Sequence, residues 1–279
     1  MMDNTAMTDH YFENDLVKLH YYKFGNGPKS MLCFHGYGMH GKQFKLLENA
    51  LGSNYTFYGF DLFFHKETKL KDQSLANIKK GISKKELATF IADFCKHAGI
   101  GRFSVIGYSM GSHYATIIVE ESGELVDEFI IAAPSSLEPG KLIRFFSKNK
   151  TGNNILEKLT LSEKALVRML KVFKRLRLIN EQDFKILFSE IGTAELRFNF
   201  YACFTYLRFL ETDEQCLLEA INANNIKSIF IFGSRDKTFP PKIGDKFIPK
   251  LQRSEVVILD EGHEMIKKDF VTSLTKMLS

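Results

Sequence analysis

Apolar runs that suit strands alternate with helical patterns along most of the chain. Strands are expected at residues 16–25, 29–36, 55–62, 102–109, 128–134, 226–234 and 255–260. Helices are expected between several of these runs, as over 83–100, where Leu87, Phe90 and Phe94 fall on one helical face. Strands that alternate with helices are typical of βαβ units, so the pattern predicts an α/β protein with a mostly parallel sheet.

Between about residues 138 and 223 this alternation stops, and only helical periodicity remains. The pattern predicts a helical insertion over 138–223 that divides a core domain into a first part, 1–137, and a second part, 224–279. One helix of the insertion should be mostly buried, because apolar residues share one of its faces. These residues are Leu196, Phe200, Cys203, Leu207 and Leu210.

Length and composition suit a large core, since the chain has 279 residues, of which 44% are hydrophobic. The first fifteen residues lack the basic start and apolar centre of a secretory signal, and no apolar run approaches the roughly 20 residues that cross a bilayer. Four cysteines at irregular spacing in apolar segments are typical of buried, reduced thiols. They are Cys33, Cys95, Cys203 and Cys216. A cytoplasmic location is therefore expected.

Charge is nearly balanced overall, with 38 Lys or Arg against 33 Asp or Glu, and no nucleic-acid partner is expected. Residues 141–185 are an exception, because they hold twelve basic residues and four acidic ones. A solvated helix surface explains this excess most simply. The alternatives are steering of an anionic substrate and peripheral contact with an acidic membrane surface.

The strongest chemical signal is VIGYSMGSHYA, where a strand-like run passes into a helix at Ser109. Gly107 and Gly111 flank the serine, as a strand-to-helix turn requires when it has no room for side chains there. Such a turn holds the serine in a strained conformation above the edge of the sheet. The helix start then directs the backbone N–H of Met110 at whatever the serine attacks. A plain turn between strand and helix could carry the same pattern.

A serine nucleophile needs a base and a group that orients the base. His263 follows the last expected strand in LDEGHEM, and Asp236 follows the preceding strand in IFGSRDKTFP. Parallel strands end at one edge of the sheet, so these side chains should meet there. Asp260 is a weaker candidate for the acid, because it precedes the loop that carries His263. The glycine-rich HGYG at 35–38 suggests a second oxyanion donor, the backbone N–H of Tyr37.

Several other polar residues are better explained by structure than by chemistry. Asp61 should shape the turn at the end of its strand, His65 should be structural, and His113 should pack beneath the turn at Ser109. No group of Cys, His and carboxylate residues has metal-ligand spacing, and there is no phosphate-binding loop. Neither a metal nor another cofactor is expected.

Together these motifs resemble the α/β-hydrolase superfamily from about residue 16 to the end of the chain. CFHGYG looks like its oxyanion motif, GFDLFFH like its strand-end loop, GYSMG like its nucleophile elbow, and GSRDKTFP and GHE like its acid and histidine loops. The resemblance implies a mostly parallel eight-stranded sheet with helices on both faces, from which this chain could lack the first strand. It also implies that the insertion is the cap of this family.

Departures from the family pattern narrow the choice within it. A serine at position 109 argues against haloalkane dehalogenases and epoxide hydrolases, which carry aspartate there. Menaquinone-pathway synthases have a similar elbow but usually an arginine soon after it, where this chain has Ser112 and His113. In the strand-end loop, Phe63 and Phe64 replace the usual Pro-Gly, so the conformation of that loop is open.

The expected activity is that of a serine hydrolase acting on a small-molecule carboxylic ester or thioester through an acyl-enzyme. One alternative is a lyase or synthase of the same fold, for which a cap pocket lined by carboxylate-binding arginines would be the sign. The other is a ligand-binding member with little turnover. The sequence names neither the acyl group nor the leaving group, and it does not give the oligomeric state.

Overall fold

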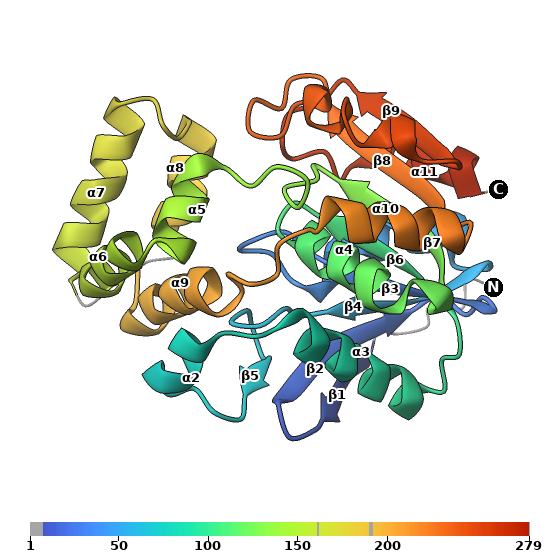
Figure 1. Cartoon of the computed structure of the whole chain (residues 1–279), viewed down its shortest axis with the longest axis horizontal. Helices are drawn as coiled ribbons and strands as arrows, with labels where there is room; N and C mark the ends of the chain where they lie inside the picture. The colour runs from blue at the N-terminus through green and yellow to red at the C-terminus, as the bar shows by residue number, and fades with distance from the viewer. Residues whose placement is uncertain (1–7, 161, 190–191, 279) are drawn as a thin grey trace.

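A nine-stranded sheet forms the centre of the computed structural model over its described residues, 8–160, 162–189 and 192–278 (Figure 1). The strands run in the order β1-β2-β4-β3-β6-β7-β8-β9, with β5 paired to β2. Their bounds are β1 (Thr8–Glu13), β2 (Val17–Phe24), β3 (Lys29–Phe34), β4 (Tyr55–Phe60), β5 (Lys69–Leu70), β6 (Phe103–Tyr108), β7 (Val126–Ala132), β8 (Lys227–Gly233) and β9 (Ser254–Leu259). β2 is antiparallel to its neighbours, whereas all pairings from β4 across to β9 are parallel.

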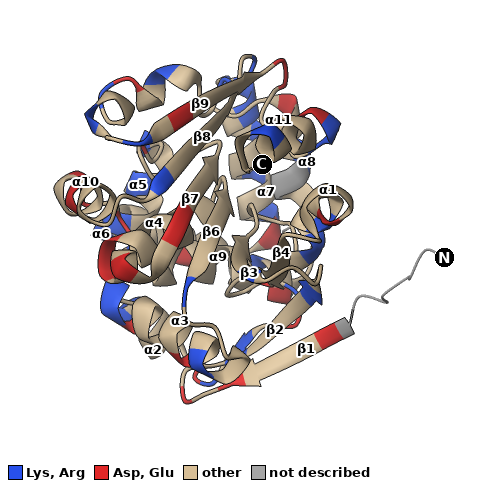
Figure 2. Ribbon diagram, turned by 90° about the vertical axis from the view of Figure 1, so that its right-hand side faces the viewer, with Lys and Arg blue, Asp and Glu red and all other residues tan. Residues whose placement is uncertain are grey.

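Helices cover both faces of this sheet (Figure 2). One face carries α3 (Lys84–Ala98), α4 (Gly111–Ser122) and α10 (Glu214–Ala223), with η2 (Gly123–Leu125). The other carries η1 (Gly41–Leu47), α1 (Glu48–Leu51) and α11 (Lys268–Leu278). Shorter elements are α2 (Leu75–Lys80), η3 (Pro241–Gly244) and η4 (Ile248–Lys250). Although Pro240 is typical of a helix start, the residues that follow it form only the two short 3₁₀ helices η3 and η4.

The two helical layers explain why the central strands read as continuous apolar runs. Every residue of β6 is buried, because both faces of a central parallel strand are covered. At the edge strand β9, Val256 and Ile258 are exposed while their neighbours Val257 and Leu259 are buried. Burial therefore alternates along the edge strand and not along the centre.

The sheet does not lack its first strand, so that expectation is wrong. β1 pairs with β2 along its whole length, from Thr8 opposite Lys23 to Glu13 opposite Lys18. An edge strand needs few buried residues, and the ring of Phe12 supplies the main contact by packing against Phe94. The polar TDHYFE sequence therefore gave no apolar pattern from which to predict the strand.

A group of five described helices lies between β7 and β8 and stands apart from the sheet (Figure 1). They are α5 (Lys141–Lys148), α6 (Lys150–Thr160), α7 (Glu163–Arg175), α8 (Glu181–Ser189) and α9 (Ala194–Tyr206). We call this group the cap. α10, the last helix of the predicted insertion 138–223, instead packs on α4 in the core layer, where Leu217 and Ile221 are buried.

Burial of the predicted apolar face near α9 is uneven. Phe200, Cys203 and Leu210 are buried, whereas Leu196 and Leu207 are half-buried.

The cysteines differ in burial, since Cys33, Cys95 and Cys203 are buried free thiols and Cys216 is exposed at the start of α10, contrary to expectation. Among the described helices, none has both the length and the apolar character that crossing a bilayer requires.

The turn between β6 and α4 depends on close backbone contacts at its two glycines. A Cβ atom on Gly111 would lie 2.0 Å from the carbonyl oxygen of Phe34, and one on Gly107 would lie 2.6 Å from the carbonyl oxygen of Gly111. Any side chain would push α4 away from β3 and β6. As the sequence predicts, the turn has no space for side chains at positions 107 and 111.

Gly111→Ala is expected to lower the free energy of unfolding by about 1–3 kcal/mol, because the added methyl group overlaps backbone atoms. Gly101→Ala is the matched control, since a Cβ there meets no heavy atom within 4 Å, and it should change stability by less than about 1 kcal/mol. Urea unfolding of both variants tests this, and equal destabilisation would contradict the assigned contact.

Candidate active site

Three residues predicted from the sequence meet above the carboxyl edge of the sheet. Ser109 follows β6, Asp236 follows β8 and His263 follows β9. Oγ of Ser109 lies 3.1 Å from Nε2 of His263, and Nδ1 of His263 lies 2.8 Å from Oδ2 of Asp236. The serine has a φ of +49°, a conformation that costs a residue with a side chain about 1–3 kcal/mol.

Asp236 is held by three hydrogen bonds in a buried position. Besides His263 at Oδ2, its Oδ1 accepts the backbone N–H groups of Thr238, at 2.8 Å, and Phe239, at 3.0 Å. Burial acts to raise the pKa of Asp236, but the hydrogen bond and charge of His263 and the two N–H groups outweigh it and lower the pKa. The carboxylate therefore stays ionised and can hold a proton on Nδ1 of His263.

Asp260, the weaker candidate for the acid, points elsewhere. Its side chain is 87% exposed, with Oδ1 3.4 Å from Nε of Arg235 and 3.3 Å from Oγ of Ser234. These contacts leave the orientation of His263 to Asp236.

Tyr108 supports the imidazole and was not singled out from the sequence. Its hydroxyl donates to the backbone carbonyl oxygen of His263 at 2.7 Å, and its ring centroid lies 5.4 Å from that of His263. The ring of Phe239 lies 5.6 Å from the imidazole. An aromatic residue directly before the serine was the available signal, but its contact with a loop 155 residues away requires the fold.

The two expected oxyanion donors, Tyr37 and Met110, line one cavity together with Ser109. Met110 immediately precedes α4, where backbone N–H groups have no partner within the helix. The loop of Tyr37 is fixed on both sides, because the N–H of Gly36 donates to Oε1 of Gln43 and the N–H of Gly38 donates to Nε2 of His65. The main chain at Tyr37 is thereby held next to the serine.

Two buried neutral histidines hold this loop from below. Nε2 of His35 accepts the N–H of Leu62 at 3.1 Å, so its Nδ1 carries the proton and donates to the carbonyl oxygen of Gly36. His65 is arranged alike, with Nδ1–H donating to the carbonyl oxygen of Phe63. Burial lowers the pKa of His65 to about 4. Both rings are structural here, as expected for His65.

The strand-end loop beside them has two residues with positive φ, and neither of them is glycine. Asp61 contributes to this loop through its backbone carbonyl oxygen, which accepts the hydroxyl of Thr68 at 2.6 Å, whereas its carboxylate accepts the N–H of Gly41 at 2.8 Å and contacts Nδ1 of His20 at 2.7 Å. Phe64 has a φ of +64° and Lys66 a φ of +48°. Two residues that are not glycine thus have left-handed conformations in the loop where Phe63 and Phe64 replace Pro-Gly.

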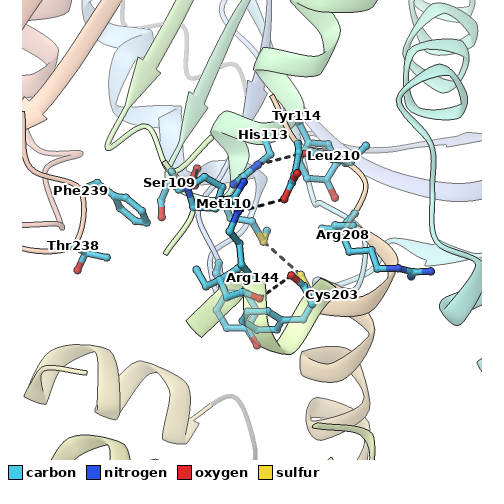
Figure 3. A pocket seen from close by; sticks show the side chains of 18 residues that line it. Ser109, Met110, His113, Tyr114, Arg144, Cys203, Arg208, Leu210, Thr238 and Phe239 are labelled. Carbon is cyan, nitrogen blue, oxygen red and sulfur yellow. Dashed lines mark hydrogen bonds and ion pairs between the residues drawn. The ribbon is translucent and has the colours of Figure 1, made fainter. Parts of the chain in front are cut away.

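A cavity of about 220 Å³ lies above Ser109, between the core and the cap (Figure 3). We call it the catalytic cavity. Its lining is mostly apolar, and the cap contributes Ile143, Phe204 and Leu207. His113 also lies in this wall and not beneath the elbow, with Nδ1 3.1 Å from the carbonyl oxygen of Leu210, because the first turn of α4 faces the cap.

The two arginines of the cavity lining are both engaged. Nε of Arg144 lies 3.6 Å from Glu211, a residue that Lys148 also contacts. Arg208 donates to the carbonyl oxygens of Thr205 and Lys80, and in Figure 3 its guanidinium points away from Ser109. The arginine arrangement that would indicate a lyase is not seen in the described lining.

Part of the basic excess in the cap forms a row on the outer side of α7. The row consists of Lys164, Arg168, Lys171 and Arg175. All four are exposed, and none forms an ion pair with another described residue. Whether this row is merely solvated or attracts an anionic partner stays a prediction.

In the described part of the chain, no three His, Cys, Asp or Glu side chains are grouped so that they could hold a metal ion.

Comparisons with known proteins agree with this architecture. The family model of the alpha/beta hydrolase fold matches residues 29–160. A membrane phospholipase A described as a bacterial virulence factor shares 20% identity at a TM-score of 0.69, over 98% of this chain and 86% of its own. An esterase from Thermogutta terrifontis shares 16% identity at a TM-score of 0.69, over 98% of both chains.

The thioesterase domain of the curacin biosynthetic pathway shares 13% identity at a TM-score of 0.64, over 98% of this chain and 99% of its own. No curated protein sequence matches the chain. The chain therefore has the α/β-hydrolase fold, and its residues 29–160 are similar to the sequences of that family.

The neutral state of His65 predicts a specific pH dependence of stability. Its pKa is about 4 in the folded chain and about 6.5 when unfolded, so the unfolded state binds more protons between these values. Stability should fall as the pH drops from above 6.5 toward 4, by about 2 kcal/mol at pH 5 from this residue alone. Urea unfolding at pH 7.5 and pH 5 should show a smaller loss for His65→Gln than for the wild type.

His97→Gln is the matched control, because His97 is exposed at the end of α3. It should keep the wild-type pH dependence. If His65→Gln also keeps it, the buried neutral imidazole is not the source of the effect.

Proposed function

We propose that this protein is a serine hydrolase that cleaves a carboxylic ester or thioester through an acyl-enzyme. The observation that carries the proposal is the chain of contacts from Ser109 to His263 to Asp236, at 3.1 and 2.8 Å, with Ser109 in the lining of a mostly apolar cavity. The fold supports hydrolase activity, and structures with this fold include an esterase, a phospholipase and a thioesterase.

The first half of the proposed reaction forms the acyl-enzyme. Nε2 of His263 takes the hydroxyl proton while Oγ of Ser109 attacks the carbonyl carbon, and ionised Asp236 stabilises the imidazolium. The N–H groups of Tyr37 and Met110 bind the oxyanion that develops. His263 then gives its proton to the leaving alcohol or thiol as the carbonyl re-forms.

The second half releases the acid. Water loses a proton to Nε2 of His263 and attacks the acyl carbon, and the same two N–H groups bind the second oxyanion. Collapse of this intermediate breaks the bond to Oγ, which takes back the proton from His263. Ser109 is then ready for another substrate.

The two alternatives have less support. A lyase that binds a carboxylate substrate would use free cationic side chains, whereas Arg144 and Arg208 are engaged by Glu211 and by backbone carbonyl oxygens. A binding protein needs no ordered contacts from a serine to a histidine to a buried carboxylate. If this protein only bound a ligand, the strained φ of Ser109 would serve no purpose.

Ser109→Ala should lower kcat for p-nitrophenyl butyrate by on the order of 10⁴ to 10⁶, because the nucleophile is lost. A fluorophosphonate probe should label the wild type at Ser109, which peptide mass spectrometry can show. Ser147→Ala is the matched control, since Ser147 also lines the cavity but its hydroxyl donates to the carbonyl oxygen of Ile143 within α5, and this variant should still be labelled. Turnover that survives in Ser109→Ala would exclude the serine mechanism.

Asp236→Asn should lower kcat by around 10⁴, because the imidazole loses the partner that fixes its tautomer. Asp260→Asn should keep kcat near the wild-type value and change stability by less than about 0.5 kcal/mol, because its side chain is exposed. Steady-state kinetics and urea unfolding of both variants provide the test. Exchanged kinetic phenotypes would assign the acid to Asp260.

A further inference from the structure

A second cavity lies inside the cap, and we call it the cap cavity. It has a volume of about 110 Å³ and lies among α5, α6, α7, α9 and the segment after α7. All its lining residues are apolar, including Leu156 of α6, Met169 and Phe173 of α7, and Phe200 of α9. None of these side chains can form a strong hydrogen bond with a ligand.

The cap cavity adjoins the catalytic cavity. Ile143 of α5 and Phe204 of α9 line both of them. The ring of Phe204 lies 4.9 Å from that of Phe200 on the cap side and 6.4 Å from that of Tyr37 on the side of the oxyanion loop. The side chains of Phe204 and Ile143 therefore lie between the two cavities, and a ligand that fills both would pass between them.

The lining defines the chemistry of what can enter. A polar group would lose its hydrogen bonds to water and find no replacement, whereas each methylene group gains from leaving water. A saturated hydrocarbon chain meets both conditions. It is also narrow along its whole length, so it needs little space between the side chains of Phe204 and Ile143.

We propose that the cap cavity binds the distal part of a long, unbranched acyl chain whose carbonyl carbon lies at Ser109. This inference rests on the proposed function. The acyl part is favoured over the leaving group because the alcohol or thiol must depart before water attacks. The acyl chain stays attached to Oγ of Ser109 throughout, so a subsite deep in the cap suits it.

The wild-type enzyme provides the first test. With p-nitrophenyl esters from acetate to palmitate, kcat/KM should rise by up to about fourfold for each methylene that enters the cavities, and then level off. Acetate esters of linear alcohols of the same lengths should show no such rise. A rise with alcohol length and not with acyl length would overturn the inference, because the cavity would then hold the leaving group.

The second test blocks the cap cavity from α7. Met169 lines the cavity, whereas Val172 lies on the outer side of the same helix with 46% exposure. Met169→Trp should lower the ratio of kcat/KM for laurate to that for butyrate by about tenfold, by removing space for one or two methylenes. Val172→Trp, which adds the same side chain outside, should keep the wild-type ratio.

Leu156→Phe fills the same cavity from α6. If Met169→Trp does not fold, the ratio of kcat/KM for laurate to that for butyrate is measured in Leu156→Phe instead. If the folded cavity variants keep the wild-type ratio of kcat/KM for laurate to that for butyrate, the acyl subsite is overturned. In that case the proposed function still stands, provided that hydrolysis of butyrate depends on Ser109. Hydrolysis of no ester or thioester of any length would overturn both.

Discussion

The close backbone approach of Gly111 to Phe34 is the contact on which the site depends. It brings α4 against β3 and leaves Ser109 at the top of a turn with a positive φ. The carbonyl oxygen of Ser109 offsets this strain by accepting three hydrogen bonds, from the N–H and Oγ of Ser112 and from Oγ of Ser135. Its N–H donates to Ala132 of the next strand. The serine is thus fixed through its backbone, and its side chain remains available for chemistry.

This anchoring gives Ser112 a clear structural role. It stands near the position where menaquinone-pathway synthases usually have an arginine, and here its hydroxyl also accepts the backbone N–H of Ser136. An arginine in its place would be buried without these bonds, which is costly for a charged group. The elbow of this chain is therefore built for small polar side chains beneath the serine, and the cavity above it stays mostly apolar.

The sequence was sufficient to predict that three candidate residues lie close together, because parallel strands end at one edge. Ser109, Asp236 and His263 each follow a strand, and that topology alone brings them together. The sequence did not predict β1, because an edge strand with one buried aromatic residue has no apolar pattern. It also did not separate α10 from the cap, since helical periodicity shows that a face is buried but not what covers it.

Side-chain contacts between distant segments were equally out of reach. The hydroxyl of Tyr108 reaches the carbonyl oxygen of His263, and Nδ1 of His113 contacts Leu210 in the segment between α9 and α10. Each pair joins the end of β6 or the start of α4 to a segment far along the chain. Neither segment's own sequence encodes where the other one lies.

The core and the cap contribute different kinds of side chains to the catalytic cavity and its surroundings. The core holds Ser109 and His263, to which the proposed function assigns the proton transfers, and it fixes them with buried neutral histidines, an ionised Asp236 and backbone hydrogen bonds. The cap contributes apolar side chains, and it meets the core where Sγ of Cys203 lies 3.4 Å from Sδ of Met110 and where Phe200 packs against Tyr37. Because apolar packing tolerates substitution better than a hydrogen-bonded charge does, the cap can change its lining while the core geometry stays. The cap lining can therefore change without disturbing the contacts among Ser109, His263 and Asp236.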